Sequence, residues 1–440
     1  MATSSFDVIV IGAGAAGLIA AGELAAAGRS VLILEARDRV GGRIWTRREP
    51  GLAVPVELGA EFIHGHAPVT RGQLARAGVP AIDSSDLHLA LRDGHIQPRD
   101  DFFPRMHRVL ARSDALTRQD MSFDAFLEEH LASVLSPEER QRARRMAEGF
   151  DAADPARASA RAIVAEWTGD TLGSAPQSRP RDGFESLLTA LVSSLQGARV
   201  RLHLQATVRE VRWSRGSVEV AGDFLGAPLV VQAPRVLVTV PLGVLQQPSG
   251  AAGSLQFSPA LTMKREALGG LASGPVVKVL LRFATTFWDT LYEARYQGVS
   301  FLHSPDTEIP TFWTAAPAHA PLLVAWAGGP RVPRITAGAT PEAIVRTALT
   351  GVQALFGNAV DVAAELTGYY YHDWQRDPYA CGAYSYVTVG GSGARSALAL
   401  PVDATLFFAG EATNTDDDAG TVEGALQSGL RAARELLMSG

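Results

Sequence analysis

The stretch "FDVIVIGAGAAGLIAAGELAAAGRSVLILEARDRVGGRIWT", residues 6–46, decides the fold. An apolar run ends at Gly12, and Gly14 and Gly17 complete a G-x-G-x-x-G spacing that opens an alanine-rich helix. Such a turn brings backbone N–H groups and a helix N-terminus close to a pyrophosphate. Residues 30–34 form a second apolar run, typical of a buried parallel strand. The stretch predicts a dinucleotide-binding βαβ unit in an α/β fold, although a turn of small residues in an ordinary α/β domain would share part of the pattern.

The residues after the second strand narrow the choice of nucleotide. Glu35 ends that strand, where a carboxylate accepts hydrogen bonds from a ribose 2′-OH and repels a 2′-phosphate. Gly41 and Gly42 then bring a second backbone loop close, and Arg43 offers a planar guanidinium to a pyrophosphate. A plain NAD site has no need of this second loop.

Composition sets the outer limits on the function. The chain has 440 residues, of which 47% are hydrophobic and 20% charged, which is enough for two or three domains. A net charge of −6 gives no electrostatic argument for nucleic acid as a partner. A single cysteine excludes an intramolecular disulfide and a thiolate metal cluster, so no metal site is expected. The sequence has neither a signal-peptide pattern nor an apolar run of membrane-spanning length, so we expect a cytoplasmic protein with no membrane partner. The protein could also form a homodimer.

The periodicity along the rest of the chain indicates how the elements are organised. Residues 66–180 are expected to be largely helical, with the arginine-rich segment 137–145 as a solvated face. Residues 200–222 alternate apolar and polar side chains around Arg215 and Gly216, which predicts a hairpin. The other expected elements are a helix at 181–195, buried strands at 235–246, 275–288 and 321–329, a helix at 341–356, a strand and turn at 406–414, and a closing helix at 421–437.

Several further motifs occur in a fixed order along the chain. They are "VELGAEFIHG" (56–65), "VTVPLGVL" (238–245), "KVLLRF" (278–283), "DWQRDPYACGAYSY" (373–386), "FAGEATN" (408–414) and "GTVEGALQSGLRAA" (420–433). Together with the R-x-G-G-R segment that ends at Arg43, they make the sequence resemble the FAD-dependent amine oxidase superfamily. The branch it resembles contains polyamine oxidases, monoamine oxidases and lysine-specific demethylases.

The resemblance implies a two-domain architecture in which both domains are discontinuous. A Rossmann-type FAD-binding domain would comprise residues 1–68, 185–254 and 375–440. An inserted α+β substrate domain with a helical insert would comprise residues 69–184 and 255–374.

The resemblance also implies how FAD is held. Monoamine oxidases attach the flavin through a cysteine directly before the cage tyrosine, and Ala383 stands at that position here, so FAD should bind noncovalently. The residues expected to contact FAD are Gly12, Gly14, Ala15, Ala16, Gly17, Glu35, Ala36, Arg37, Gly42, Arg43, Gly59, Ala60, Glu61, Phe62, Val208, Trp374, Gly410, Glu411, Thr421 and Val422.

Four residues are expected to serve catalysis. The resemblance places Lys278 at a water on flavin N5 and Tyr384 as one wall of an aromatic cage, with Thr421 in place of the second tyrosine of monoamine oxidases. His64 matches a histidine of animal polyamine oxidases. The alternatives are a solvent-facing lysine on an edge strand, a core tyrosine and a structural histidine.

The implied reaction is the oxidation of an amine. A hydride passes from the α-carbon to FAD, the imine hydrolyses to an aldehyde or ketone, and O2 as electron acceptor yields hydrogen peroxide. Thr421 and the acidic residues Asp416, Asp417 and Asp418 favour an extended small-molecule amine such as a polyamine, although the acids would equally cap a helix. The rivals are an L-amino-acid oxidase, for which the sequence reveals no cation to meet a carboxylate, and a non-catalytic flavin-fold binding protein.

Overall fold

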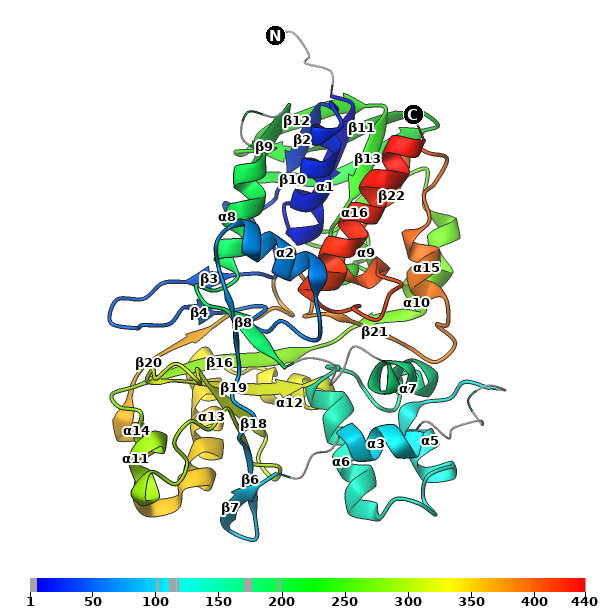
Figure 1. Ribbon diagram of the computed structural model, residues 1–440. Helices are drawn as coiled ribbons and strands as arrows, with labels where there is room; N and C mark the ends of the chain where they lie inside the picture. Colours follow the sequence, from blue (N-terminus) through cyan, green and yellow to red (C-terminus); the bar gives the residue numbers. More distant parts are fainter. Residues whose placement is uncertain are drawn as a thin grey trace.

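The computed structural model describes residues 6–99, 103–110, 116, 119–169, 176–195, 197 and 199–439. Its upper half, seen in Figure 1, is built on a five-stranded parallel sheet of order β22-β13-β1-β2-β9. The strands come from distant parts of the chain: β1 (Val8–Ile11), β2 (Val31–Leu34), β9 (Val200–His203), β13 (Arg235–Val238) and β22 (Leu406–Phe408). The expected βαβ unit is present, with Gly28 just beyond the end of its helix.

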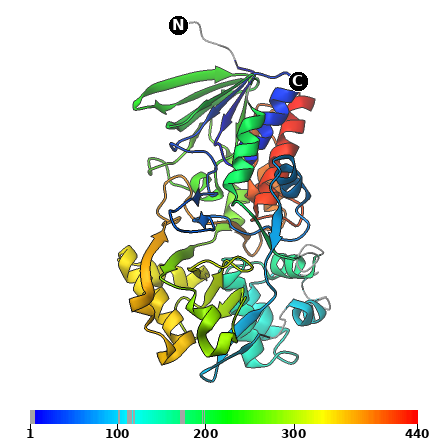
Figure 2. The same ribbon diagram turned by 60° about the vertical axis from the view of Figure 1, so that its left-hand side comes forward.

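Both faces of the parallel sheet are covered, which explains its uninterrupted apolar strands. Val8 and Val10 pack against a helical layer, whereas Ile9 and Ile11 point the other way into a second sheet. The helices are α1 (Ala15–Ala26), α2 (Pro68–Arg76), α8 (Glu185–Ser194) and α16 (Val422–Met438). The second sheet has the order β12-β11-β10-β14, with β10 (Ala206–Ser214), β11 (Ser217–Phe224), β12 (Ala227–Ala233) and β14 (Gln256–Ser258). Figure 2 shows the three layers side by side.

The lower half is built on a seven-stranded mixed sheet of order β20-β16-β19-β18-β17-β6-β7. Its strands are β6 (His88–Arg92), β7 (His95–Pro98), β16 (Val276–Phe283), β17 (Phe301–His303), β18 (Thr311–Thr314), β19 (Leu322–Gly328) and β20 (Leu366–Tyr371). Helices α11 (Phe287–Ala294), α12 (Val332–Thr336), α13 (Pro341–Phe356) and α14 (Val362–Glu365) supply the core on one side of this sheet.

A separate helical group with its own core lies beside this sheet. It contains α3 (Phe103–Leu110), α5 (Phe123–Glu129), α6 (Pro137–Gly149) and α7 (Ala160–Thr168). The remaining short elements are β3 (Thr46–Arg47), β4 (Val56–Glu57), β5 (Ala81–Asp83), β8 (Ser178–Pro180), α9 (Leu242–Leu245), α10 (Arg265–Gly269), β15 (Leu271–Ser273), β21 (Ser385–Val387) and α15 (Ala394–Ala399), with 3₁₀ turns at Thr262–Lys264, Gly329–Arg331, Gly357–Ala359 and Glu411–Thr413.

Three sequence expectations are corrected here. The supposedly helical region 66–180 contains β5, β6, β7 and β8, because β6 pairs in parallel with β17, a segment more than 200 residues away, and β5 pairs with β8. The strand expected over 235–246 ends at Val238, because Pro241 starts the short helix α9. The strand expected over 275–288 ends at Phe283, and its last two residues begin helix α11. The hairpin turn, the 341–356 helix and the closing helix are confirmed within one or two residues.

The boundaries given for the two domains stay a prediction. Helix α2 begins at the end of the first segment assigned to the FAD-binding domain and packs into the helical layer, with Leu74 in the same core as α1 and α16.

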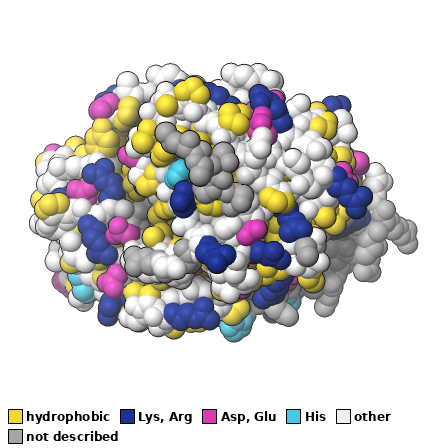
Figure 3. Space-filling view, turned by 90° about the horizontal axis from the view of Figure 1, so that it is seen from above, with side chains coloured by type: hydrophobic (Ala, Val, Ile, Leu, Met, Phe, Trp, Pro, Cys, Tyr) yellow, Lys and Arg dark blue, Asp and Glu magenta, His cyan; other side chains and the backbone are white. Residues whose placement is uncertain are grey.

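The surface above the parallel sheet mixes charges of both signs. Figure 3 shows basic and acidic side chains scattered among hydrophobic and other groups. Within the described part of the chain, no helix combines the length and the apolar character that a membrane span requires.

The contact between α1 and α16 generates a prediction about stability. A Cβ added at Gly429 would lie 2.4 Å from the Ala16 carbonyl oxygen and 2.7 Å from Ile19 Cγ2, so the two helices would have to separate. We expect Gly429→Ala to lower stability by about 1–3 kcal/mol, seen as a lower urea midpoint in tryptophan fluorescence.

Gly22→Ala, also in a helix of this layer, is the matched control. Its Cβ would meet Ser194 Oγ at an ordinary 3.5 Å, so stability should stay the same or rise by up to about 1 kcal/mol. Equal midpoints for the two variants would show that close helix packing at Gly429 is unimportant.

Candidate active site

A cavity of about 1700 Å³ is lined by residues from both the parallel sheet and the seven-stranded sheet. All of the residues expected to contact FAD or to serve catalysis line it, with one exception, Gly17. Gly17 lies beneath the turn, where a Cβ would be 2.1 Å from the Gly12 carbonyl oxygen. The sequence motifs therefore converge on one cavity, and Gly17 serves the packing that lets the turn form.

The glycine-rich turn forms a cradle in which only backbone can fit. Gly12 has a φ of +106°, and a Cβ there would lie 2.8 Å from Thr239 Oγ1. Gly14 forms a β-bridge with Gly41, so the two glycine loops lie directly beside each other. The pair of loops predicted from the sequence thus forms one continuous wall of the cavity.

Glu35 is buried at the end of β2 and fastens this wall. Its Oε2 accepts a hydrogen bond from Ala13 N at 2.8 Å, and its Oε1 accepts one from Arg37 N at 2.9 Å. A carboxylate has about four lone-pair sites, so two backbone bonds leave acceptor capacity for a ribose hydroxyl. The geometry fits the ribose role expected from the sequence and adds a structural one.

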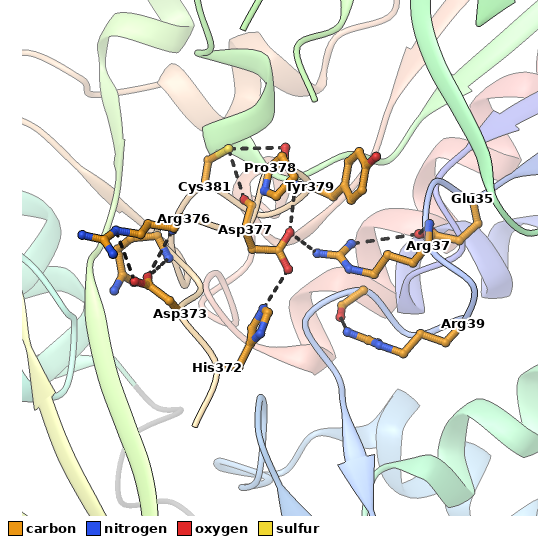
Figure 4. A network of polar contacts seen from close by, with 12 residues as sticks. Glu35, Arg37, Arg39, His372, Asp373, Arg376, Asp377, Pro378, Tyr379 and Cys381 are labelled. Carbon is orange, nitrogen blue, oxygen red and sulfur yellow. Dashed lines mark hydrogen bonds and ion pairs between the residues drawn. The ribbon is translucent and has the colours of Figure 1, made fainter. Parts of the chain in front are cut away.

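Arg37 links this wall to the segment after β20, as Figure 4 shows. Its Nη2 lies 2.6 Å from Asp377 Oδ1, while His372 Nε2 lies 2.8 Å from Asp377 Oδ2. Burial would raise the pKa of Asp377, but the hydrogen bonds from His372 and Arg37 outweigh it and hold that pKa well below its usual range. The charge of Arg37 is therefore balanced within the protein.

Arg43 reaches across to the C-terminal motifs. Its Nη1 donates to Glu411 Oε1 at 3.0 Å and to the Ala383 carbonyl oxygen, while Ser385 Oγ donates to Glu411 Oε2 at 2.6 Å. Burial would raise the pKa of Glu411, but the charges of Arg43 and Arg395 lower it overall. Glu411 is thus an ionised carboxylate that joins the R-x-G-G-R segment, through Arg43, to the motif that contains Ser385.

Lys278 is buried on a central strand, because β16 lies between β20 and β19. Its Nζ lies 2.8 Å from Glu61 Oε2 and donates to the Gly59 carbonyl oxygen at 2.9 Å. Glu61 Oε1 also accepts from Arg179 Nε at 2.8 Å and from Trp313 Nε1 at 2.9 Å. Burial would raise the pKa of Glu61, but the charges of Lys278 and Arg179 lower it overall. Because Lys278 is buried and its strand has a neighbour on each side, the alternative of a solvent-facing lysine on an edge strand is wrong.

Tyr384 lies in the cavity wall with its hydroxyl fixed. Its Oη donates to the Phe150 carbonyl oxygen at 2.6 Å, and a Cβ at Gly420 would lie 3.6 Å from its ring. Burial, followed by the charges of Asp151 and Glu166, raises the pKa of Tyr384 well above its usual value, so the phenol stays neutral.

Thr421 caps α16 and presents no ring to the cavity. Its Oγ1 accepts from Gly424 N at 3.0 Å and donates to the Asp418 carbonyl oxygen at 2.6 Å. The side chain that caps the helix is therefore Thr421, and the alternative role of the preceding aspartates as side-chain caps is wrong. Asp418 instead accepts from Gln427 Nε2 at 2.8 Å, whereas Asp417 lines the cavity.

His64 lies between two phenylalanine rings. Its ring centroid is 6.1 Å from that of Phe62 and 5.7 Å from that of Phe150. Burial lowers the pKa of His64 to about 4, so the imidazole is neutral over the physiological range.

Trp374 and Val208 complete the expected set. Trp374 Nε1 donates to the Leu58 carbonyl oxygen at 2.9 Å, which fixes the ring against the segment that carries Gly59. Val208 stands at a β-bulge in β10 and lines the cavity.

The structure adds an acidic wall that sequence reasoning missed. Asp151 and Glu166 lie close to each other and to Tyr384, and Asp417 lies near Glu166. Burial, and then the charge of Glu166, raise the pKa of Asp151 well above its usual value, which favours a proton on this pair. No local motif marks Asp151 and Glu166, because they come from the helical region and meet Tyr384 only in the fold, whereas Asp417 belongs to the acidic run already noted in the sequence.

The arginine-rich segment 137–145 is only partly the solvated face that was expected. Arg144 pairs with Asp124 at 2.5 Å on one side of α6, whereas Arg142 and Arg145 line the cavity. Helical periodicity alone shows that the arginines share a face but not what that face meets.

Comparison with known proteins agrees with this arrangement. The sequence matches the family described as flavin containing amine oxidoreductase over residues 15–437. It is 30% identical to lysine-specific histone demethylase 2 of Homo sapiens over 98% of this chain and 53% of that protein. It is also 30% identical to polyamine oxidase 3 of Oryza sativa subsp. japonica over 98% of this chain and 89% of that protein. The chain spans between 30% and 53% of the length of the first demethylases that it matches.

Solved structures share the fold across the whole chain. Putrescine oxidase bound to putrescine has a TM-score of 0.79 at 22% identity, and cyclohexylamine oxidase from Brevibacterium oxydans has 0.79 at 21%, each covering 99% of both chains.

A glycine-cradled dinucleotide site joined to a mixed-sheet domain defines a two-domain flavoprotein, and this chain belongs to the flavin-containing amine oxidoreductase family. Its cofactor is FAD, for which the glycine cradle, Glu35 and the large cavity provide a fitting site. Ala383 lines the cavity, whereas Cys381 Sγ lies 3.5 Å from the carbonyl oxygens of Asp377 and Pro378, an arrangement that fits the expected noncovalent FAD.

The position of Glu35 generates a prediction about cofactor affinity. We expect Glu35→Gln to weaken FAD binding about ten- to a hundredfold, because a charge-assisted hydrogen bond contributes about 1.5–3 kcal/mol. Fluorescence titration of the apoprotein with FAD measures this change, and Glu23→Gln, an exposed position on α1, is the control. If both variants bound FAD with equal affinity, the proposed hydrogen bond from the ribose to Glu35 would be contradicted.

Proposed function

We propose that the protein oxidises an amine to an imine, which water then hydrolyses to an aldehyde or ketone, with O2 reduced to hydrogen peroxide. When bound, FAD supplies the redox chemistry by accepting a hydride from the α-carbon of the amine. The observation that carries the proposal is that Lys278, Tyr384 and the FAD cradle line one cavity. The names of the polyamine oxidase and putrescine oxidase relatives support it.

Lys278 is placed to hold a water in the cavity. An ammonium has three N–H donors; the Gly59 carbonyl oxygen accepts from one, and Glu61 Oε2 lies at ion-pair distance. A remaining donor would be available to a water molecule, with the ammonium held in place by the buried ion pair. Lys278 would thereby hold water at the flavin, the role that the sequence resemblance assigns to it.

Tyr384 and His64 would shape the site for an uncharged nitrogen. An amine must lose its ammonium proton before it can give up a hydride, and a neutral imidazole does not repel the ammonium form on entry. The Asp151–Glu166 pair, beside Tyr384, would hold or accept that proton. The ring of Tyr384, fixed by its bond to Phe150, would form the single aromatic wall of the cage.

The acidic wall also supports an extended amine with a second positive charge, such as a polyamine. Glu166 and Asp417 face one part of the cavity, where a second ammonium would meet carboxylates. Among the described residues near the FAD cradle, Arg37 and Arg43 both pair with carboxylates, so neither favours an L-amino acid whose carboxylate lies beside the reacting nitrogen.

Replacing Lys278 tests its proposed role of holding a water molecule in the cavity. We expect Lys278→Met to retain FAD but to slow both flavin reduction by amine and reoxidation by oxygen, because no donor then holds the water. Anaerobic and aerobic stopped-flow spectra separate the two half-reactions. Rates equal to those of the parent protein in both half-reactions would contradict the role.

The acidic wall is tested by substrate preference. We expect kcat/KM for putrescine or spermidine to exceed that for benzylamine, and Glu166→Gln to reduce this ratio at least tenfold, equivalent to about 1.4 kcal/mol in transition-state binding. Asp416→Asn, an exposed acid in the loop that carries Asp417, is the control and should leave the ratio unchanged. A preference for benzylamine of tenfold or more in the parent protein would refute the extended-amine assignment.

A further inference from the structure

The floor of the cavity gives a length scale for the substrate. Lys278, Trp326, Thr311 and His303 are successive cross-strand partners on β16, β19, β18 and β17, and all four line the cavity. Cross-strand partners project from the same face of a sheet. Three strand spacings of about 4.8 Å place His303 about 14 Å from Lys278.

The middle of this floor is apolar. The ring centroid of Phe301 lies 5.7 Å from that of Phe62 and 5.8 Å from that of Trp313, and all three residues line the cavity. An aliphatic chain that left Lys278 along the floor would therefore cross aromatic rings before it reached His303.

A guanidinium stands at the far end of the floor. Arg99 follows β7, donates its backbone N–H to the His88 carbonyl oxygen at 2.9 Å, and places Nη1 3.2 Å from His303 Nδ1. Burial, and then the charges of Arg99 and His88, lower the pKa of His303 well below its usual value. The neutral imidazole accepts a hydrogen bond but cannot balance the charge of Arg99.

Arg99 differs from other arginines in the cavity wall. Four of those pair with carboxylates: Arg37 with Asp377, Arg43 with Glu411, Arg145 with Asp306, and Arg331 with Glu148. Within the described ranges, which omit residues 100–102, no carboxylate lies within ion-pair distance of Arg99. Burial, and then repulsion from Arg142 and Arg92, lower the pKa of Arg99 to about 10, so the guanidinium remains charged.

A partly buried cation without a balancing anion carries a desolvation cost, and the anion of a ligand would offset that cost. We propose that Arg99, supported by His303, binds a carboxylate at the far end of the amine substrate. A monoanion suits this end better than a phosphate dianion, because Asp306, shortly after His303 in the chain, also lines the cavity. The inference rests on the proposed amine oxidation and adds long-chain ω-amino carboxylates to the extended amines that the cavity would accept, with their anion at Arg99.

The test compares carboxylates with uncharged analogues of equal length. Homologous ω-amino carboxylates and their primary amides are given to the FAD-loaded enzyme, and kcat/KM is measured for each. We expect the carboxylate-to-amide ratio to exceed tenfold at the chain length that spans the floor. Arg99→Gln should lower that ratio at least tenfold, Arg99→Lys should retain part of it, and Arg76→Gln, exposed on α2, should leave it unchanged.

Two results would overturn the inference while leaving amine oxidation intact: a ratio near one at every chain length, or an unchanged ratio in Arg99→Gln. If no amine bleaches the flavin, the proposed function itself fails. Calorimetric titration with unreactive alkyl carboxylates and alkyl amides then decides the site. Tighter binding of the carboxylate that Arg99→Gln abolishes supports the site, and equal binding of both compounds rejects it.

Discussion

The ion pair between Lys278 and Glu61 is the interaction on which the geometry of the cavity depends. It joins a central strand of the seven-stranded sheet to the segment that follows β4, and Arg179 extends it to β8. Two buried charges are tolerated only when well paired and hydrogen-bonded, and removing one partner typically costs about 3–5 kcal/mol. Because the donors and acceptors match at 2.8–2.9 Å, the position of the sheet relative to the cofactor cradle is fixed within narrow limits.

The cavity is electrically divided along its length. Near the FAD cradle, Arg37 pairs with Asp377 and Arg43 pairs with Glu411, so the positive charges of these two arginines are balanced. Beside Tyr384 the wall is acidic, and across the aromatic floor it is basic at Arg99. Such a division would select substrates by the position of their charges as well as by their length, since charges in a low-dielectric cavity interact strongly.

Much of the fold follows from sequence patterns because the relevant constraints are local. The G-x-G-x-x-G turn needs Gly12 in a left-handed conformation, which glycine alone adopts without strain. The β10–β11 hairpin and the helix at 341–356 likewise depend on turn chemistry and periodicity within a few residues. By contrast, β6 was not predicted because its partner strand β17 lies more than 200 residues away, and β7, which is short and mostly polar, pairs only with β6.

By itself, the sequence determined the dinucleotide cradle, the family and which motif residues line the cavity, because these motifs carry their chemistry in short contiguous stretches. Only the tertiary structure decided the electrostatics of the cavity. Lys278 meets the Gly59 carbonyl oxygen across 219 residues of sequence, Arg99 meets His303 across 204, and Glu61 meets Arg179 across 118. Whether a charge is balanced, buried or available to a ligand depends on these long-range neighbours, which no spacing along the chain reveals.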